Sequence, residues 1–292
     1  MTTVTVAATQ MACGPNATDN LARADALIRD AAGQGANIVL LQELFETPYF
    51  PAVMEDARRE LARPFEKHPM IAHMSALARE LGIVLPVGFF ERDGDAFYNS
   101  LTVIDADGRV GALYRKSHIP EGPGYEEKFY FSPGDTGFRV WETRYGVIGV
   151  GVCWDQWFPE CARAMALQGA ELLFYPTAIG NEPQDPNYDS SGHWRCVMQG
   201  HAAANMVPVV ASNRVGVERN PGADMTFYGS SFIADHKGAV VAQAPCRGEA
   251  IIIAAFDLSK IREKRRNWGL FRDRRPDLYA SLISAPVGDE NT

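Results

Sequence analysis

Residues 147–155 read Val-Ile-Gly-Val-Gly-Val-Cys-Trp-Asp, an apolar run that leads directly into a cysteine. Such a short, continuous apolar run predicts a buried strand. A helix is expected to follow, because Pro159 suits a first helical turn and Glu160 favours the positive N-terminal end of a helix. The pattern therefore places Cys153 on a tight turn at the carboxyl edge of a sheet, where backbone amides can bind an oxyanion.

Strands and helices alternate on both sides of this turn. The spacing of apolar residues predicts a helix from the cap Thr18 to Gly33 or Gly35, and a second helix over 71–81 that Gly82 ends. Further helices are expected near 160–168 and 192–205. Short apolar runs predict strands at 3–9, 38–41, 83–89, 172–175 and 208–212.

Three predicted hairpins interrupt this alternation, each with a glycine in its turn. They pair residues 101–104 with 109–114, 138–142 with 147–152, and 232–234 with 239–242. Strand–helix alternation with added hairpins predicts large mixed sheets covered by helices. Because no linker, repeat or low-complexity tract divides the 292 residues, we expect one domain of two packed sheets.

The composition indicates a folded protein that binds neither nucleic acid nor membranes. Apolar residues make up 46% and charged residues 22%, and the net charge of −8 comes from interspersed acids and bases. We find no basic stripe, no signal-peptide pattern and no apolar run near the roughly 18 residues of a membrane span. The five cysteines are an odd number without a C-x-x-C pair, which favours a reduced, cytoplasmic setting.

A cysteine nucleophile needs help at neutral pH, because a free thiol has a pKa of about 8.5. Lys116, at the end of an expected strand, can favour the thiolate, and Glu43, just past another strand, can take the thiol proton. From these residues alone, Cys153 can equally be a buried structural cysteine, and the two charged residues can form a structural ion pair. The other cysteines lack this setting and are expected to be structural: Cys13, Cys161, Cys196 and Cys246.

Glu43, Lys116 and Cys153 lie in three separate blocks that resemble the nitrilase, or carbon–nitrogen hydrolase, superfamily in residue type and order, over residues 3–257. The resemblance implies a four-layer αββα sandwich of two mixed β-sheets. It implies a single domain over residues 1–292 with its core at 3–257, and a tail, 258–292, at the interface of a homo-oligomer built from dimers. It also implies a small-molecule substrate and no metal or cofactor.

The same resemblance implies a mechanism through a cysteine thioester. Glu43 takes the thiol proton, Cys153 attacks the carbonyl carbon, and Lys116 and the backbone N–H of Trp154 stabilise the oxyanion. Glu43 then gives its proton to departing ammonia and activates the hydrolytic water.

Other segments are similar to the branch of this superfamily that hydrolyses N-carbamoylputrescine to putrescine, ammonia and carbon dioxide. This similarity implies that Glu127 orients Lys116, with the neighbouring Glu126 as the alternative. Asn181 stands where Ser is expected, a small change between short polar residues. The segments that carry the similarity are residues 114–120, 122–131, 178–185 and 193–201.

The substrate of that branch ends in an ammonium group, and burying that charge requires a carboxylate partner. Glu182 is the predicted partner, with Asp185 or Asp189 next in line, although an ordinary solvated loop acid is the alternative for each. The similarity places this loop at the pocket mouth. The four-carbon chain of the substrate is expected to lie against Tyr49, Tyr125 and Trp154.

Several alternatives stay open. Carbamoylases and β-ureidopropionases of the superfamily act on carboxylate substrates and typically place Arg shortly after the nucleophile, where this chain has Gln156 and Trp157. Arg195 or Arg214 can still supply that charge from elsewhere, and an aliphatic amidase is a further alternative. The intact triad argues against an inactive binding module. The lack of a resolving cysteine near Cys153 in sequence argues against a thiol redox protein.

Other kinds of site have no motif in this sequence. No H-E-x-x-H or clustered His/Cys spacing predicts zinc, and no G-x-x-x-x-G-K-[ST] predicts phosphate binding. Gly149 and Gly151 lie inside a strand, so they do not form a dinucleotide-binding turn. His118, His193 and His201 are expected to be structural, because Lys and Glu already fill the activating roles.

Overall fold

The first strand, β1 (Thr3–Gln10), sends alternate side chains into two different cores. Val4, Val6 and Ala8 are buried between two sheets, whereas Ala7 packs beneath the outer helices. This alternation is what a strand buried on both faces produces. The computed structural model describes residues 3–185, 187–220, 222 and 224–284.

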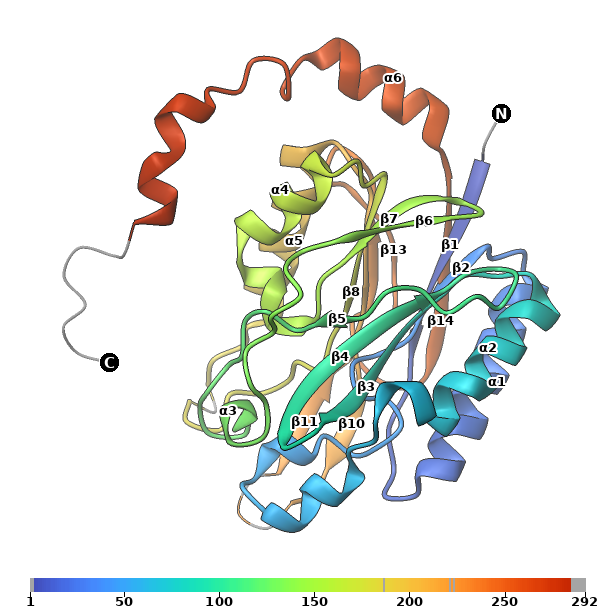
Figure 1. Cartoon of the computed structure of the whole chain (residues 1–292), viewed down its shortest axis with the longest axis vertical. Helices are drawn as coiled ribbons and strands as arrows, with labels where there is room; N and C mark the ends of the chain where they lie inside the picture. The colour runs from blue at the N-terminus through green and yellow to red at the C-terminus, as the bar shows by residue number, and fades with distance from the viewer. Residues whose placement is uncertain (1–2, 186, 221, 223, 285–292) are drawn as a thin grey trace.

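Two mixed β-sheets form the inner layers (Figure 1). A parallel bridge from Ile38 to Val84 joins the two halves of the first sheet. The strands of the first sheet are, in spatial order, β14 (Ala250–Asp257), β1, β2 (Ile38–Leu40), β3 (Leu85–Asp93), β4 (Ala96–Ile104) and β5 (Tyr114–Arg115). Those of the second are β13 (Val240–Gln243), β12 (Phe232–Ala234), β9 (Val209–Ser212), β8 (Leu172–Pro176), β7 (Gly146–Val150) and β6 (Val140–Thr143).

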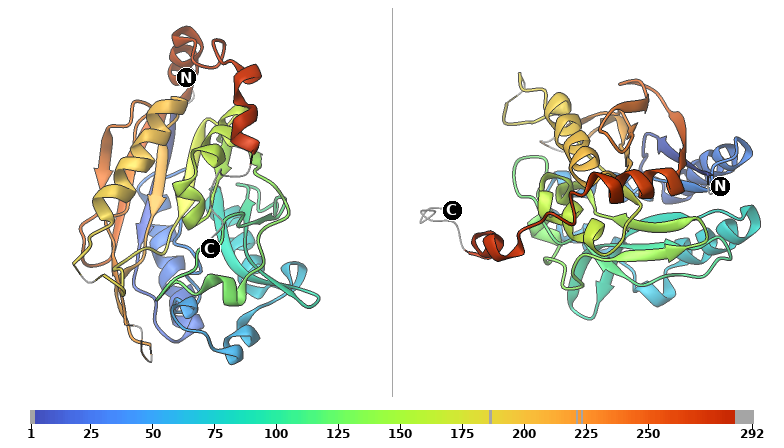
Figure 2. Two further views of the ribbon diagram at one scale, coloured as in Figure 1. Left: turned by 90° about the vertical axis from the view of Figure 1, so that its left-hand side faces the viewer. Right: turned by 90° about the horizontal axis from the view of Figure 1, so that it is seen from above.

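Helices cover the outer faces of both sheets (Figure 2). α1 (Ala17–Gly33) and α2 (Pro69–Leu81) pack on the first sheet, and α4 (Pro159–Leu167) and α5 (Ser191–Asn205) pack on the second. This arrangement of four layers confirms the predicted αββα sandwich.

The second sheet is built by the same alternation as the first. In β8, Leu172 and Phe174 enter the core between the sheets, and Leu173 and Tyr175 enter the core beneath α4 and α5. Burial of each such side chain stabilises the folded state by about 1.5–3 kcal/mol, so the two cores hold the sheets and helices against one another.

Shorter elements connect these layers and extend beyond them. α6 (Leu258–Trp268) and the 3₁₀ helix η5 (Pro276–Ile283) lead away from the sandwich (Figure 1). Within the described residues, no helix has the length and apolar character needed to cross a membrane. The remaining elements are η1 (Phe50–Ala52), η2 (Asp56–Leu61), η3 (Phe65–Lys67), α3 (Glu127–Tyr130), η4 (Cys153–Trp157), β10 (Val215–Glu218) and β11 (Met225–Tyr228).

Three local predictions differ from the structure. Asn16, not Thr18, caps α1, because its side-chain oxygen accepts a hydrogen bond from the N–H of Thr18 at 2.9 Å. Residues 109–113 form no regular strand, because only an isolated bridge from Val110 to Ile104 pairs with β4 before Tyr114–Arg115 do. The helix after Cys153 is split into η4 and α4, and Pro159 starts the second piece.

Candidate active site

Cys153 is the first residue of η4, on the sharp turn that follows β7. Its backbone φ is +43°, a left-handed conformation that a residue with a side chain adopts only where its surroundings hold it. Before this turn, the backbone at Gly151 passes too close to its neighbours for a side chain, since a Cβ there would lie 2.9 Å from the Tyr175 ring and 3.0 Å from the sulfur of Cys161. Cys153 is 5% exposed, and its sulfur lies 3.8 Å from the carbonyl oxygen of Ala178.

A buried cluster of one lysine and two glutamates lies close enough for its charges to act on this thiol. The Nζ of Lys116 donates to Glu43 Oε1 at 2.9 Å and to Glu127 Oε2 at 2.6 Å, and all three side chains have no exposed surface. Asn99 donates to Glu43 Oε1 at 2.7 Å, and the Tyr49 hydroxyl donates to Glu127 Oε1 at 2.6 Å. Within the described part of the chain, Glu43 Oε2 has no hydrogen-bond partner.

The charges of this cluster determine its proton positions. Burial alone lowers the pKa of Lys116, but the carboxylates of Glu127 and Glu43 raise it well above its usual value, so the lysine is cationic. Burial raises the pKa of Glu127 to about 7, against the opposing effect of Lys116. Burial and the Glu43 carboxylate raise the pKa of Cys153 well above its usual value. The resting thiol is therefore neutral, and attack requires a proton acceptor.

Different elements carry the members of the cluster. Glu43 follows β2, Lys116 follows β5, and Glu127 is the first residue of α3. The fully buried Arg214 fixes the segment after β2, because its guanidinium donates to the carbonyl oxygen of Glu43 at 3.1 and 3.2 Å and to that of Thr47 at 3.0 Å. The ends of separate strands thus meet beside the nucleophile.

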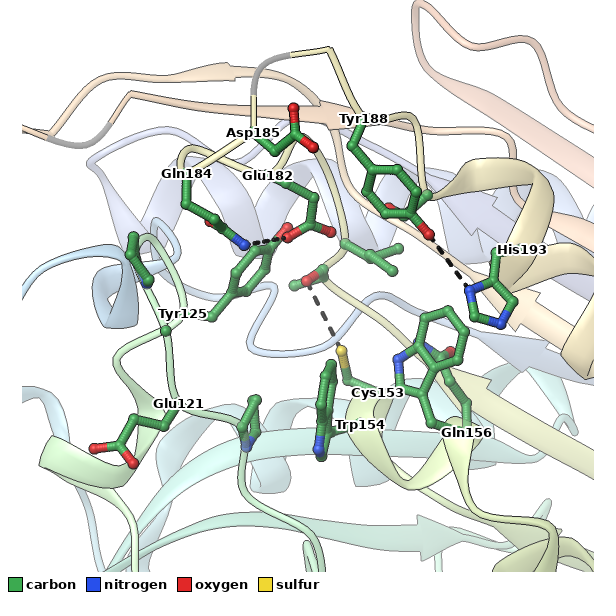
Figure 3. A pocket seen from close by; sticks show the side chains of 17 residues that line it. Glu121, Tyr125, Cys153, Trp154, Gln156, Glu182, Gln184, Asp185, Tyr188 and His193 are labelled. Carbon is green, nitrogen blue, oxygen red and sulfur yellow. Dashed lines mark hydrogen bonds between the residues drawn. The ribbon is translucent and has the colours of Figure 1, made fainter. Parts of the chain in front are cut away.

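A cavity of about 670 Å³ opens onto the sulfur of Cys153. Figure 3 shows the thiol pointing into it, with Tyr125 and Glu182 across the space and Trp154 close to the sulfur. The carboxylates that line the cavity are Glu121, Glu182 and Asp185, and no Lys or Arg of the described chain lines it. The other lining residues are Pro120, Gly122, Pro123, Gln156, Trp157, Ala178, Ile179, Gln184, Tyr188, Ser190 and His193.

The predicted substrate-binding residues divide into two groups. Tyr125, Trp154 and Glu182 line the cavity, and the Tyr125 hydroxyl accepts from the N–H of Gly180 at 2.9 Å. Tyr49 does not line it, contrary to expectation: its side chain is fully buried and its hydroxyl bonds to Glu127. Tyr49 therefore stabilises the buried cluster through its hydroxyl.

The structure separates the alternatives that the sequence left open. Glu127 rather than Glu126 bonds to Lys116, because Glu127 is buried and Glu126 is partly exposed. Asp185 lines the cavity, and Asp189 does not. Arg214 is not among the residues that line the cavity: its guanidinium is fully buried and also bonds to Glu218 Oε1 at 2.7 Å.

The remaining histidines and cysteines have varied settings. His201 lies 2.7 Å from the carbonyl oxygen of Gln156, as expected of a structural histidine, whereas His193 lines the cavity and His118 contacts Asp155. Cys13 and Cys161 are buried, but Cys196 and Cys246 are exposed, so these two have no role in the core. Among the described residues, no group of His, Cys, Asp and Glu is placed to hold a metal ion.

Sequence reasoning missed two residues of the site. Asn99 bonds to Glu43 from the middle of β4, where a polar residue within a buried stretch was the available signal. Asp155 is buried beside the nucleophile, and its position two residues after Cys153 was the only hint.

Comparisons with known proteins agree with this geometry. The carbon-nitrogen hydrolase family matches residues 5–266. An N-carbamoylputrescine amidase of Arabidopsis thaliana is 57% identical over 286 residues, 96% of this chain and 95% of that protein. A citrullinase of Francisella tularensis is 52% identical over 283 residues, 97% of this chain and 99% of that protein. The crystal structure of a carbon-nitrogen hydrolase from Helicobacter pylori has a TM-score of 0.92 and 39% identity, and the alignment covers 98% of this chain and 100% of that one. The chain therefore belongs to the carbon-nitrogen hydrolase family.

Proposed function

We propose that this hydrolase cleaves the ureido C–N bond of N-carbamoylputrescine and releases putrescine, ammonia and carbon dioxide. The observation that carries the proposal is the cavity that joins the Cys153 thiol to the Glu182 carboxylate and has no Lys or Arg among its described lining residues. A relative 57% identical to this chain, named N-carbamoylputrescine amidase, supports it.

The proposed reaction begins with proton transfer from the Cys153 thiol to Glu43. The free Oε2 atom of Glu43 suits this role, because its Oε1 already accepts from Lys116 and Asn99. The sulfur then attacks the ureido carbonyl carbon. Lys116 and the backbone N–H of Trp154, in the first turn of η4, stabilise the oxyanion.

Collapse of the tetrahedral adduct breaks the bond to the terminal ureido nitrogen. That nitrogen takes the proton from Glu43 and leaves as ammonia, so the carbamoyl group remains on sulfur as a thioester. Glu43 then accepts a proton from water, and the resulting hydroxide attacks the thioester. The carbamic acid product loses carbon dioxide and leaves the free amine, while the thiol regains its proton.

Glu182 is the proposed partner of the distal ammonium group. Its carboxylate lines the cavity and is contacted by Gln184 Nε2 at 3.3 Å, a neutral donor. Tyr125 and Trp154 offer apolar ring surface along the cavity, which suits a four-carbon chain. Asp185 adds a second negative charge at the same wall.

Citrulline is the competing substrate, because one relative above 50% identity is named citrullinase. Citrulline is N-carbamoylputrescine with one added carboxylate, on the carbon that bears the amine. The lining residues offer that carboxylate three acids and no Lys or Arg. Gln156 is neutral: its Oε1 accepts from Thr177 and Trp194 at 3.0 and 2.8 Å, and its Nε2, without a partner among the described residues, offers a carboxylate a hydrogen bond but no charge. Like-charge repulsion therefore favours the diamine-derived substrate.

Ammonia release tests this proposal with three ureido compounds. We expect kcat/KM for N-carbamoylputrescine to exceed that for L-citrulline and for N-carbamoyl-β-alanine by at least about tenfold, the equivalent of one unfavourable charge contact. A higher kcat/KM for citrulline would assign the enzyme to the other substrate.

We also propose that the chain acts as one domain in a cytoplasmic homo-oligomer built from dimers, with the tail 258–292 at the interface. The support is the apolar surface that α6 and η5 expose away from the sandwich. Residues 285–292 of this tail lie outside the described residues. Light scattering of a Leu278→Asp, Leu282→Asp variant tests this, since loss of the dimer is the expected result. The apolar residues are Trp268, Leu278, Leu282 and Ile283.

A further inference from the structure

The carboxylate of Asp155 accepts four hydrogen bonds and has no exposed surface. Its Oδ1 accepts from the backbone N–H and from Nδ1 of His118, at 3.0 and 2.8 Å. Its Oδ2 accepts from the Tyr114 hydroxyl at 2.7 Å and from the backbone N–H of Val152 at 2.9 Å. Two backbone amides and two side chains thus converge on one side chain.

These four donors come from the two segments that carry the reacting groups. Tyr114 and His118 lie two residues before and two residues after Lys116, and Val152 immediately precedes Cys153. Asp155 also closes the nucleophile turn through its own N–H, which donates to the carbonyl oxygen of Val152 at 3.0 Å. The strained φ of +43° at Cys153 lies inside this closed turn.

We propose that Asp155 is a positioning residue that fixes the Cys153 turn relative to Lys116 and thereby sets the geometry of attack. Misplacing a reacting group by a fraction of an ångström lowers the rate of a chemical step, even where substrate binding is unchanged. The roles of Cys153 and Lys116 come from the proposed function, on which this inference rests.

The two oxygens of a carboxylate can accept all four of these contacts. An asparagine at position 155 has one acceptor oxygen and one NH₂ group. If its NH₂ faces His118, it opposes a backbone N–H, and if it faces Val152, it opposes another. Either orientation leaves one buried backbone N–H without an acceptor, so Asp155→Asn disturbs one of the two segments.

The experiment compares Asp155→Asn with Asp105→Asn. Asp105 is the matched control, because its Oδ1 also accepts two backbone amides, those of Ala106 and Arg144, at 2.8 and 3.0 Å, and it does not line the cavity. Tyr114→Phe removes a single donor to Asp155, so it still tests the proposal if Asp155→Asn does not fold. Tyr145→Phe is its control, since the Tyr145 hydroxyl bonds to the distant Gly82 carbonyl at 2.6 Å.

Two readouts separate positioning from general stability. One is kcat and KM for N-carbamoylputrescine at a temperature where unfolding scans show every variant folded. The other is the pH dependence of iodoacetamide labelling at the Cys153 peptide, followed by mass spectrometry. Labelling depends on the thiol and its neighbours and not on the identity of the substrate, so it remains valid if the proposed substrate is wrong.

We expect Asp155→Asn to lower kcat by about 10- to 100-fold, the rate equivalent of one buried donor left unpaired, and to change KM by less than about threefold. The pH profile of Cys153 labelling should also shift from that of the wild type, because the thiol moves relative to Lys116. Tyr114→Phe should show the same changes at smaller size, and both controls should match the wild type. The proposal is overturned if kcat and the labelling profile of Asp155→Asn stay at wild-type values, if KM alone changes, or if Asp105→Asn loses as much activity. Should Asp155→Asn fail to fold, wild-type kinetics in Tyr114→Phe would overturn it.

Discussion

Replacing Glu182 with glutamine tests the substrate assignment most directly, because it removes one charge and keeps the shape of the side chain. In the structure, this carboxylate lines the cavity. Among the described residues, the one side-chain hydrogen bond to it comes from the neutral Gln184 amide. The change should therefore leave the Lys116 cluster and the thiol as they are. Its effect should depend on the charge at the far end of the substrate.

The partial exposure of Glu182 sets the size of the effect. Removing one partner of a fully desolvated charge pair weakens binding by about 2–5 kcal/mol. Glu182 is neither buried nor fully exposed, so a hydrogen bond to a charged group, worth about 1.5–3 kcal/mol, is the better measure. We thus expect kcat/KM for N-carbamoylputrescine to fall about 10- to 150-fold.

The assay measures ammonia release from N-carbamoylputrescine and from N-pentylurea, an uncharged compound of equal length. Activity on N-pentylurea should change by less than about threefold in Glu182→Gln, since no ion pair is lost. Glu121→Gln is the matched control, because Glu121 also lines the cavity but is exposed and paired with Lys128 at 3.0 Å. Its kinetics on both substrates should resemble the wild type.

Equal loss on both substrates would refute this reasoning and make Glu182 a structural residue. No loss on either would mean that the ammonium group is bound elsewhere. Asp185 is then the next candidate, because it lines the same cavity, whereas Asp189 does not.

The remaining predictions concern the buried cluster. Cys153→Ser should abolish ammonia release, because a hydroxyl ionises far less readily than a thiol, while Cys161→Ser should not; activity of Cys153→Ser within tenfold of wild type would remove the nucleophile from the mechanism. Lys116→Ala should lower kcat about a hundredfold or more, as loss of one oxyanion donor does. Glu43→Gln should be inactive but folded by circular dichroism, and near-normal kcat would assign the proton transfer to another residue. Glu127→Gln should fall between these variants and the wild type in kcat. Burial raises the pKa of Glu127 from 4.5 to about 7. Between these two pH values the folded state holds a proton that the unfolded state releases. The stabilisation from this group is therefore present below pH 4.5 and is lost as the pH rises through about 7. Between pH 4.5 and about 7, the free energy of unfolding measured with urea should fall less in Glu127→Gln than in the wild type.

Local sequence patterns predicted the elements that carry the reacting groups. Glu43 and Cys153 each follow a short apolar run, and both runs form strands, as predicted. Glu43 follows a strand of the first sheet and Cys153 a strand of the second, so the pattern placed each residue at a strand end, whereas their meeting depends on how the two sheets pack. Patterns of this kind are less informative where two residues compete for one role, as Asn16 and Thr18 do at the start of α1.

Contacts between distant segments were beyond the reach of these patterns. Tyr49 was expected at the substrate and instead bonds to Glu127, 78 positions away in sequence. Asn99 reaches Glu43 only because β4 pairs with β3 in one register, and a shift by one residue would turn its side chain to the other face of the sheet. Such contacts follow from the packing of whole sheets, for which a single sequence offers no local signal.

The charge balance of the cluster explains why the proton must move inside the site. Lys116 contributes one positive charge beside the carboxylates of Glu43 and Glu127, and a thiolate at Cys153 would add a further negative charge away from water. Release of the thiol proton to solvent would therefore bury an unbalanced charge, which is costly. Transfer to Glu43 keeps the net charge of the cluster constant, since one anion forms as another is neutralised. In the proposed reaction, Glu43 must give its proton to the departing ammonia before it can accept one from water, because a protonated carboxyl is no base. The two half-reactions therefore follow in order.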